Sequence, residues 1–163
     1  MTLLKPLAAL MLVAGLAACS TDVDETAAGV DPNAGAVQLD PTSVEYFNQQ
    51  IGDRVLFVTD SSVLDASAQA TLRAQAGWLM ANPARTAVIE GHADERGTRE
   101  YNLALGARRA AAARSFLVGE GVDPSRLRMV TYGKERPEAL CSSESCWSQN
   151  RRAVTVVAGG PIS

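Results

Sequence analysis

The order of strand-like and helix-like segments limits the folds open to this chain of 163 residues more than any other feature. Four short runs rich in β-branched or other apolar residues are expected to form strands, at 55–58, 86–90, 127–132 and 153–157. Two longer runs have apolar residues at helical spacing, at 66–81 and 100–118. The order β-α-β-α-β-β predicts a two-layer α/β sandwich, that is, an α+β fold whose helices pack on one face of a small mixed sheet.

Both expected helices end at residues that favour starting or stopping a helix. Asp65 is suited to cap the first helix, because its carboxylate can accept a hydrogen bond from a free backbone N–H. Asn82 and Pro83 stop that helix, since the residue before a proline is disfavoured in the α region. The second helix closes at 119–121, where glycine can adopt a left-handed backbone. These capping and stopping residues predict the same helix boundaries as the apolar periodicity.

Residues 1–18 are expected to be a signal peptide. Lys5 supplies a positive charge, and the apolar run that follows is too short to span a bilayer stably. Leu16–Cys19 resembles the lipobox of bacterial lipoproteins, in which the cysteine is acylated and becomes the new N-terminus; an ordinary signal peptide beside a cysteine is the alternative. Ser20 stands where lipoproteins kept in the inner membrane often carry aspartate. The resemblance therefore implies an outer-membrane lipoprotein anchored at Cys19.

The rest of the chain is expected to comprise a flexible tether, a folded domain and a short tail, at 19–50, 51–158 and 159–163. Thr21–Asp40 is rich in Asp, Ala, Gly and Pro and contains no aromatic residue. Such a stretch buries too little surface to offset the entropy of ordering it. A flexible linker of this kind lets an anchored domain reach away from a membrane. Tyr46, Phe47 and Ile51 are the first residues expected to join the folded part.

A run bounded by glycine, Gly91–Thr98, follows the second expected strand and contains Asp94. On the next helix, a projection at about 100° per residue places Arg109 in line with the apolar stripe and turns Arg108 about a quarter-turn away. A charge on an apolar face is costly unless a carboxylate or a ligand pairs with it. Asp94 and Arg109 therefore form either a structural salt bridge or a binding site. In the second case arginine grips a carboxylate, and the region of Asp94 receives an ammonium group.

Several separated motifs extend this pattern in a fixed order. The first is Val88–Thr98 together with Glu100–Asn102. The second is the pattern Asn-x-x-Leu-Ser-x-x-Arg-Ala, which is matched at Asn102, Leu105, Arg109 and Ala110, with Gly106 in place of the serine. The last two are Tyr132–Pro137 and Asn150–Val154. With these motifs, residues 54–157 resemble the OmpA-like peptidoglycan-binding domains. The resemblance implies a ligand, the diaminopimelate residue of the peptidoglycan stem peptide. Its amine and free carboxylate would be held around Asp94 and Arg109.

The resemblance also implies ligand contacts at Asp60 and Asn102. In the family the first strand usually ends in Phe-Asp-Phe-Asp, with a tyrosine two residues on, and this region lines the ligand. Here the run is Phe57–Asp60, with Ser62 at the tyrosine position. Asp60 is therefore kept, whereas two aromatic contacts of the family pattern are absent.

With the N-terminal motif, the whole chain resembles the peptidoglycan-associated lipoproteins of the Tol-Pal system. The resemblance implies three partners: peptidoglycan, the outer membrane through the N-terminal lipid, and Tol proteins of the periplasm and inner membrane. It implies no cofactor and no enzyme activity, and a role in envelope integrity and cell division. A mechanical tether and an interaction protein for Tol components are compatible readings. A cell-wall hydrolase is the third, and no zinc triad, paired acid and base carboxylates or activated serine can be assembled for it.

Other kinds of site find less support in the sequence. A net charge of -3 gives no electrostatic case for binding nucleic acid. His92 is the only histidine, and it makes a poor metal site without cysteine or further histidine nearby. A structural or rim role is therefore expected for His92, and no metal is expected.

Two features near the last strand concern its local structure. Cys141 and Cys146 flank four residues and are expected to close a small disulfide loop in an oxidising periplasm. The adjacent arginines, Arg151–Arg152, either pair with Glu90 or Asp94 or face the solvent. The sequence leaves these alternatives open.

Overall fold

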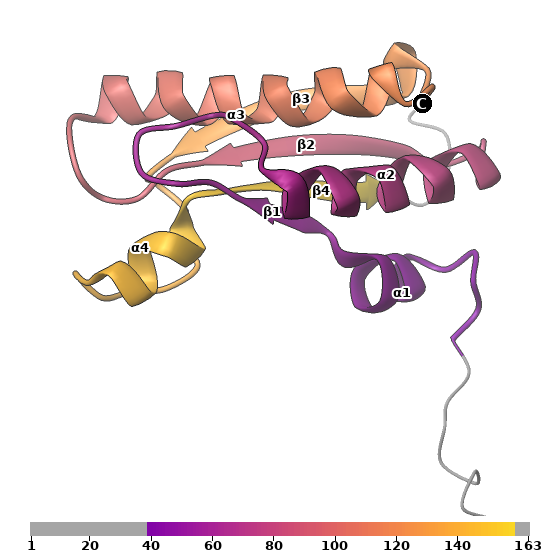
Figure 1. Ribbon diagram of the computed structural model, residues 1–163, viewed down its shortest axis with the longest axis horizontal. Coiled ribbons are helices and arrows are strands. Elements are labelled where there is room, and N and C mark those ends of the chain that lie inside the picture. Colours follow the sequence, from indigo (N-terminus) through magenta and orange to yellow (C-terminus); the bar gives the residue numbers. More distant parts are fainter. Residues whose placement is uncertain (1–38, 159–163) are drawn as a thin grey trace, which may run out of the picture. The chain divides into compact units, whose positions relative to one another are not determined.

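The computed structural model describes residues 39–158 (Figure 1). The expected signal peptide, Cys19 and most of the expected tether lie outside the described residues, as does the expected tail at 159–163. Within the described part of the chain, no helix is long and apolar enough to cross a bilayer.

Four strands form one mixed sheet in the order β1 (Arg54–Leu56), β4 (Arg152–Ala158), β2 (Thr86–His92), β3 (Leu127–Gly133). Strand β4 is antiparallel to both of its neighbours, whereas β2 and β3 are parallel. A parallel pair needs a crossover connection, and α3 (Arg99–Gly119) supplies it between β2 and β3. The mixed sheet predicted from the sequence is confirmed.

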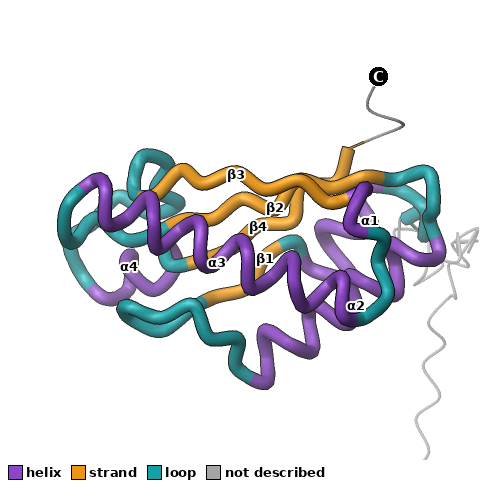
Figure 2. Tube along the Cα trace, turned by 90° about the horizontal axis from the view of Figure 1, so that it is seen from above, coloured by secondary structure: helices purple, strands orange, loops and turns teal. Residues whose placement is uncertain are grey.

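Helices α2 (Ala66–Ala81) and α3 cover one face of this sheet, as Figure 1 and Figure 2 show. Each begins at a side chain that accepts a hydrogen bond from a backbone N–H in the first turn, Asp65 at 2.7 Å and Thr98 at 3.2 Å. The bounds predicted for the first helix agree with the structure, and α3 extends one residue beyond its prediction at each end. The two-layer sandwich with both long helices on one face is confirmed.

The hydrophobic core lies between these helices and the sheet. Its largest fully buried apolar side chains are Phe47, Leu72, Leu79, Ile89 and Leu117. One contact is made by backbone alone. Gly91 of β2 lies so close to α3 that a Cβ atom added to it would be 1.9 Å from the carbonyl oxygen of Gly106. This approach draws the end of β2 against the N-terminal half of α3 and so positions the loop between them.

The folded unit begins before residue 51, where the domain was expected to start. Two short elements precede β1, the α-helix α1 (Val44–Tyr46) and the π-helix η1 (Phe47–Gly52). Phe47 is fully buried, and its ring lies 4.9 Å from that of Trp78. The Trp78 indole in turn donates a hydrogen bond to the Pro41 carbonyl at 2.7 Å. The expected end of the tether at residue 50 is therefore corrected, because burial of Phe47 orders the segment around it. Tyr46 and Ile51 pack against the same core, as their apolar character suggested.

Helix α4 (Glu144–Asn150) has no counterpart among the elements predicted from the sequence. It is short and contains two serines, which are weak helix formers, so no periodic signal marks it. The Cys141–Cys146 disulfide that the spacing suggested is present, with 5.6 Å between the Cα atoms. It closes the loop from which α4 starts. The remaining element is a short 3-10 turn before β3, η2 (Pro124–Arg126).

Candidate functional site

A pocket of about 310 Å³ opens where the loop after β1, the loop after β2 and the first turns of α3 meet. It is lined by Thr59, Asp60, Asp94, Arg96, Gly97, Tyr101, Asn102 and Leu105. Three of the four residues expected to contact a ligand, Asp60, Asp94 and Asn102, are among them. The fourth, Arg109, lies within the described residues but does not line the pocket.

The loop after β1 brings Asp60 to one side of the pocket. Asp60 has a left-handed backbone, with φ of 56°, a conformation that aspartate tolerates better than most residues. Its carboxylate accepts a hydrogen bond from the Tyr101 hydroxyl of α3. Thr59 lines the pocket beside it. Ser62, which stands at the family's tyrosine position, is not among the described residues that line the pocket.

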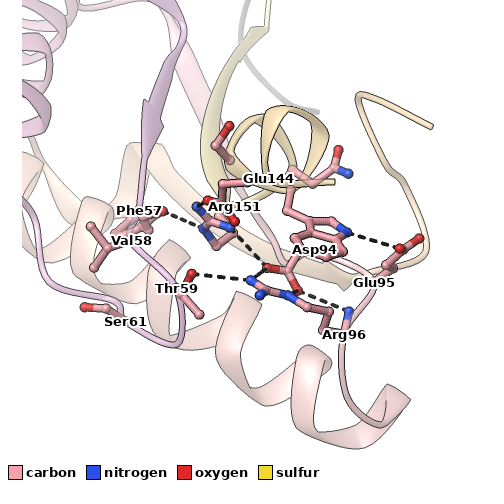
Figure 3. A network of polar contacts seen from close by, with 12 residues as sticks. Phe57, Val58, Thr59, Ser61, Asp94, Glu95, Arg96, Glu144 and Arg151 are labelled. Carbon is pink, nitrogen blue, oxygen red and sulfur yellow. Dashed lines mark hydrogen bonds and ion pairs between the residues drawn. The ribbon is translucent and has the colours of Figure 1, made fainter. Parts of the chain in front are cut away.

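The loop after β2 contributes Asp94, whose carboxylate lies between two arginines. One oxygen, Oδ2, is 2.7 Å from Arg96 Nη2 and 3.4 Å from Arg151 Nη1 (Figure 3). The other, Oδ1, accepts from the Arg96 backbone N–H at 3.1 Å. Burial acts to raise the pKa of Asp94, but the hydrogen bonds from both arginines outweigh it and hold the pKa below its usual value. Asp94 therefore carries a negative charge at neutral pH.

Arg96 is the charged residue among the described pocket-lining residues that sequence reasoning missed, although it lies inside the Gly91–Thr98 run. Its side chain is 40% exposed and reaches Thr59 Oγ1 at 3.3 Å in addition to Asp94. Asn102 sits below it on α3, 1% exposed, and donates to the Arg96 carbonyl oxygen at 2.8 Å. The pocket thus carries two carboxylates and one accessible guanidinium. An aspartate two positions before an arginine in a loop was the sequence signal that could have identified Arg96.

Arg109 lies behind the pocket and is fully buried. Its guanidinium donates to three backbone carbonyl oxygens: Ser61 at 2.9 Å, His92 at 2.8 Å and Val58 at 3.3 Å. Within residues 39–158 no ion pair joins it to Asp94, so the alternative of a direct salt bridge between them is wrong. Arg109 instead ties the loop after β1 to the end of β2. Burial lowers its pKa to about 10, which leaves it protonated at neutral pH.

The other polar residues noted in the sequence, which do not line the pocket, are buried or paired within the fold. His92 is 1% exposed, and neither ring nitrogen finds a hydrogen-bond partner among the described residues. Burial lowers its pKa to about 4, and the nearby charge of Arg152 acts in the same direction. Arg151 pairs with Asp94, whereas the charged partner of Arg152 is Glu138, at 3.5 Å. In residues 39–158, no group of three or more His, Cys, Asp or Glu side chains is placed to hold a metal ion.

Comparison with known proteins identifies the family. The sequence profile of the OmpA family matches residues 56–152, more than half of the chain. The peptidoglycan-associated lipoprotein of Mesorhizobium japonicum is 55% identical over 94% of this chain and 89% of its own length. The chain belongs to the peptidoglycan-associated lipoproteins of the OmpA family. Another member of this family, from Haemophilus influenzae, is 42% identical over 87% of this chain and 90% of its own length.

Solved structures share the fold of this OmpA-family domain. The crystal structure of the peptidoglycan-associated lipoprotein from Burkholderia pseudomallei has a TM-score of 0.68 at 40% identity, covering 73% of this chain and 100% of that one. The C-terminal domain of Helicobacter pylori MotB has a TM-score of 0.62 at 20% identity, covering 66% of this chain and 84% of that one. The second likeness shows the fold alone.

Proposed function

We propose that this chain binds peptidoglycan without cleaving it, and that the pocket holds the diaminopimelate residue of the stem peptide. The observation that carries the proposal is the pocket's set of charges. Asp60 and Asp94 provide two carboxylates, and Arg96 provides an accessible guanidinium beside them. The free end of the diaminopimelate side chain carries an ammonium group and a carboxylate group, which complement these carboxylates and this guanidinium. Relatives named peptidoglycan-associated lipoproteins support an association with peptidoglycan.

In this proposal the ligand's ammonium lies between the two aspartates, where opposite charges attract in a partly buried site. The ligand's carboxylate is received by Arg96, whose planar guanidinium suits a carboxylate. Arg109 maintains the pocket from behind, through the carbonyl groups of the two loops. These carbonyl groups use three of the five guanidinium N–H donors of Arg109, and its full burial keeps the remaining two away from the pocket opening.

Titration with two matched muropeptides tests the site. One carries diaminopimelate, and the other carries lysine, which has the ammonium but lacks the extra carboxylate. We expect the lysine ligand, and separately the Asp94→Asn and Asp60→Asn proteins, to bind about tenfold more weakly or worse, because each loses a charge-assisted hydrogen bond. Glu45→Gln, which neutralises an exposed acid on α1, serves as the control and should bind normally. Equal affinity for both ligands, together with normal binding by both aspartate variants, would rule out the proposed site.

The domain is further proposed to tether the outer membrane to the wall through acyl chains at Cys19. Acyl chains anchor a protein in proportion to their buried methylene groups, so multiple chains hold firmly. Many anchored copies on a repeated ligand add avidity without tight single contacts. Mass spectrometry of the mature N-terminus should find the acyl mass, and Cys19→Ser should release the domain from the outer-membrane fraction. A mature protein without acyl groups would end this part of the proposal.

Tol proteins of the periplasm and inner membrane are the proposed protein partners, with a shared role in envelope integrity and cell division. The support is membership of a family whose pattern extends over most of the chain. Crosslinking in cells, followed by mass spectrometry, should recover Tol components with this chain. If no Tol component is recovered while the crosslink to peptidoglycan persists, the proposal of Tol partners fails and only the tethering role remains.

A further inference from the structure

The α4 segment, residues 141–150, lies against the pocket without contributing any of the described lining residues. Figure 3 shows Arg96 and Arg151 approaching Asp94 from different sides. Both reach the same carboxylate oxygen, at 2.7 Å and 3.4 Å. The charge pattern that faces a ligand therefore depends on where these two arginine side chains are held.

Trp147 of α4 holds the first of them. The Arg96 guanidinium lies over the Trp147 ring, 4.3 Å from its centroid. The indole is itself fixed, because its Nε1 donates to Glu95 Oε1 at 3.1 Å. Arg96 stands on an exposed loop, and a free arginine side chain has many rotamers to lose on binding. Stacking on a fixed indole restricts that freedom before any ligand arrives.

Glu144, the first residue of α4, holds the second. Arg151 is buried, and its Nε donates to the Phe57 carbonyl at 3.0 Å. Its Nη2 pairs with the Glu144 carboxylate. Both holding side chains thus come from one helix. That helix begins in the loop closed by the Cys141–Cys146 disulfide.

We propose that the disulfide-closed α4 segment sets the affinity of the pocket, with Trp147 and Glu144 as positioning residues that hold Arg96 and Arg151 against Asp94. The ligand part of this inference rests on the proposed function, because it concerns binding of the same diaminopimelate group. The positioning itself requires no ligand. Arginines placed in advance lower the entropy that is lost on binding.

Three variants and one control test the proposal in the full folded domain. Trp147→Ala removes the stack, and Trp147→Phe keeps an aromatic face but loses the indole donor. A Cys141→Ser and Cys146→Ser double variant opens the loop. Arg73→Ala is the matched control, because it breaks a cation–π contact of the same kind with Phe116, 5.5 Å away, which is not part of the pocket. Circular dichroism and urea midpoints establish that each variant is folded.

Two readouts are measured on each protein: the affinity for the diaminopimelate muropeptide and the pKa of Asp94 by carboxyl NMR. We expect Trp147→Ala and the double cysteine variant to bind about threefold to tenfold more weakly, with the pKa of Asp94 moving up toward its ordinary value. Trp147→Phe should lie between wild type and Trp147→Ala, and Arg73→Ala should match wild type. Adding a dithiol reductant to the wild type should reproduce the double variant, and should leave the double variant unchanged.

The two proposals fail in different ways. A wild-type domain that does not bind the muropeptide overturns the proposed function, and the pKa of Asp94 still decides whether α4 positions the arginines. Normal wild-type binding, with affinity and pKa unchanged in folded Trp147→Ala, overturns the further inference alone. A loss equal to that of Trp147→Ala in Arg73→Ala would also overturn it, because the effect would then be a general loss of stability.

Discussion

Two buried charges with different kinds of partner organise the pocket at the scale of single residues. Asp94 is compensated by two arginines. Arg109 is fully buried and is compensated by three carbonyl dipoles. The helical projection correctly put Arg109 on the buried face of α3, because that depends only on helix geometry. Its partners come from loops remote in sequence, which a projection of one helix cannot reveal.

Arg109→Lys should destabilise the domain by about 2–4 kcal/mol. A single ammonium cannot reproduce the planar set of donors, so carbonyl groups now bonded to Arg109 would lose their partners in a buried place. Urea unfolding measures the change. Arg108→Lys, on the exposed neighbour, should alter the free energy of unfolding by less than about 0.5 kcal/mol. Equal effects at the two positions would contradict the role assigned to Arg109.

His92 should make stability depend on pH between about 4 and 6.5. Its pKa is about 4 in the folded domain and about 6.5 in an unfolded chain. Between these values the unfolded chain binds the extra proton, so the stabilisation is complete above pH 6.5 and is lost as the pH falls toward 4. We expect a loss on the order of 2 kcal/mol. The urea midpoints of wild type should fall relative to those of His92→Gln over this range, and parallel curves would refute the expectation.

At the scale of elements, the contact between β2 and α3 decides where the pocket forms. Gly91 and Gly106 allow the two backbones to touch, which places the Asp94 loop beside the first turns of α3. The strands and long helices were predictable because periodicity and caps act within a few residues. Helix α4 was not, since it is short and its place depends on a disulfide and on Arg151.

Gly91→Ala should destabilise the domain by about 2–3 kcal/mol or prevent folding, because the new methyl group meets the Gly106 carbonyl at 1.9 Å and backbone must move. Gly77→Ala is the matched control at an exposed position of α2, where nothing lies within 4 Å of the added atom. It should stabilise by about 0.5–1 kcal/mol, through higher helix propensity. Thermal unfolding measures both changes. An unchanged melting temperature for Gly91→Ala would show that the two backbones can move apart without loss of stability, which contradicts this prediction.

For the whole molecule, the aromatic contact between Phe47 and Trp78 marks where the folded unit starts. It packs α1 and η1 against the long helix α2. The composition of Thr21–Asp40 indicated a tether, but it could not show where the tether ends. That depends on whether one aromatic side chain finds a place in the core.

A chain that begins at residue 51 should therefore be much less stable than one that begins at residue 39. The shorter chain loses Phe47, and removal of a buried aromatic side chain costs about 3–5 kcal/mol. Phe47→Ala in the longer chain should reproduce most of the loss. Urea unfolding compares the three proteins. Equal stability of the two lengths would return the domain boundary to residue 51.

The sequence by itself determined the order of the four strands and the two long helices and the cap at Asp65, because each depends on neighbours along the chain. It also singled out Asp94 as a loop acid, whereas Asp60 was implied by the family resemblance. The tertiary structure alone decided the partners of the buried charges. Arg151 reaches Asp94 across 57 positions, and Arg109 reaches the loop after β1 across 48 and 51. A charge buried by folding takes whichever polar groups the packing brings to it, and local patterns carry no record of that choice.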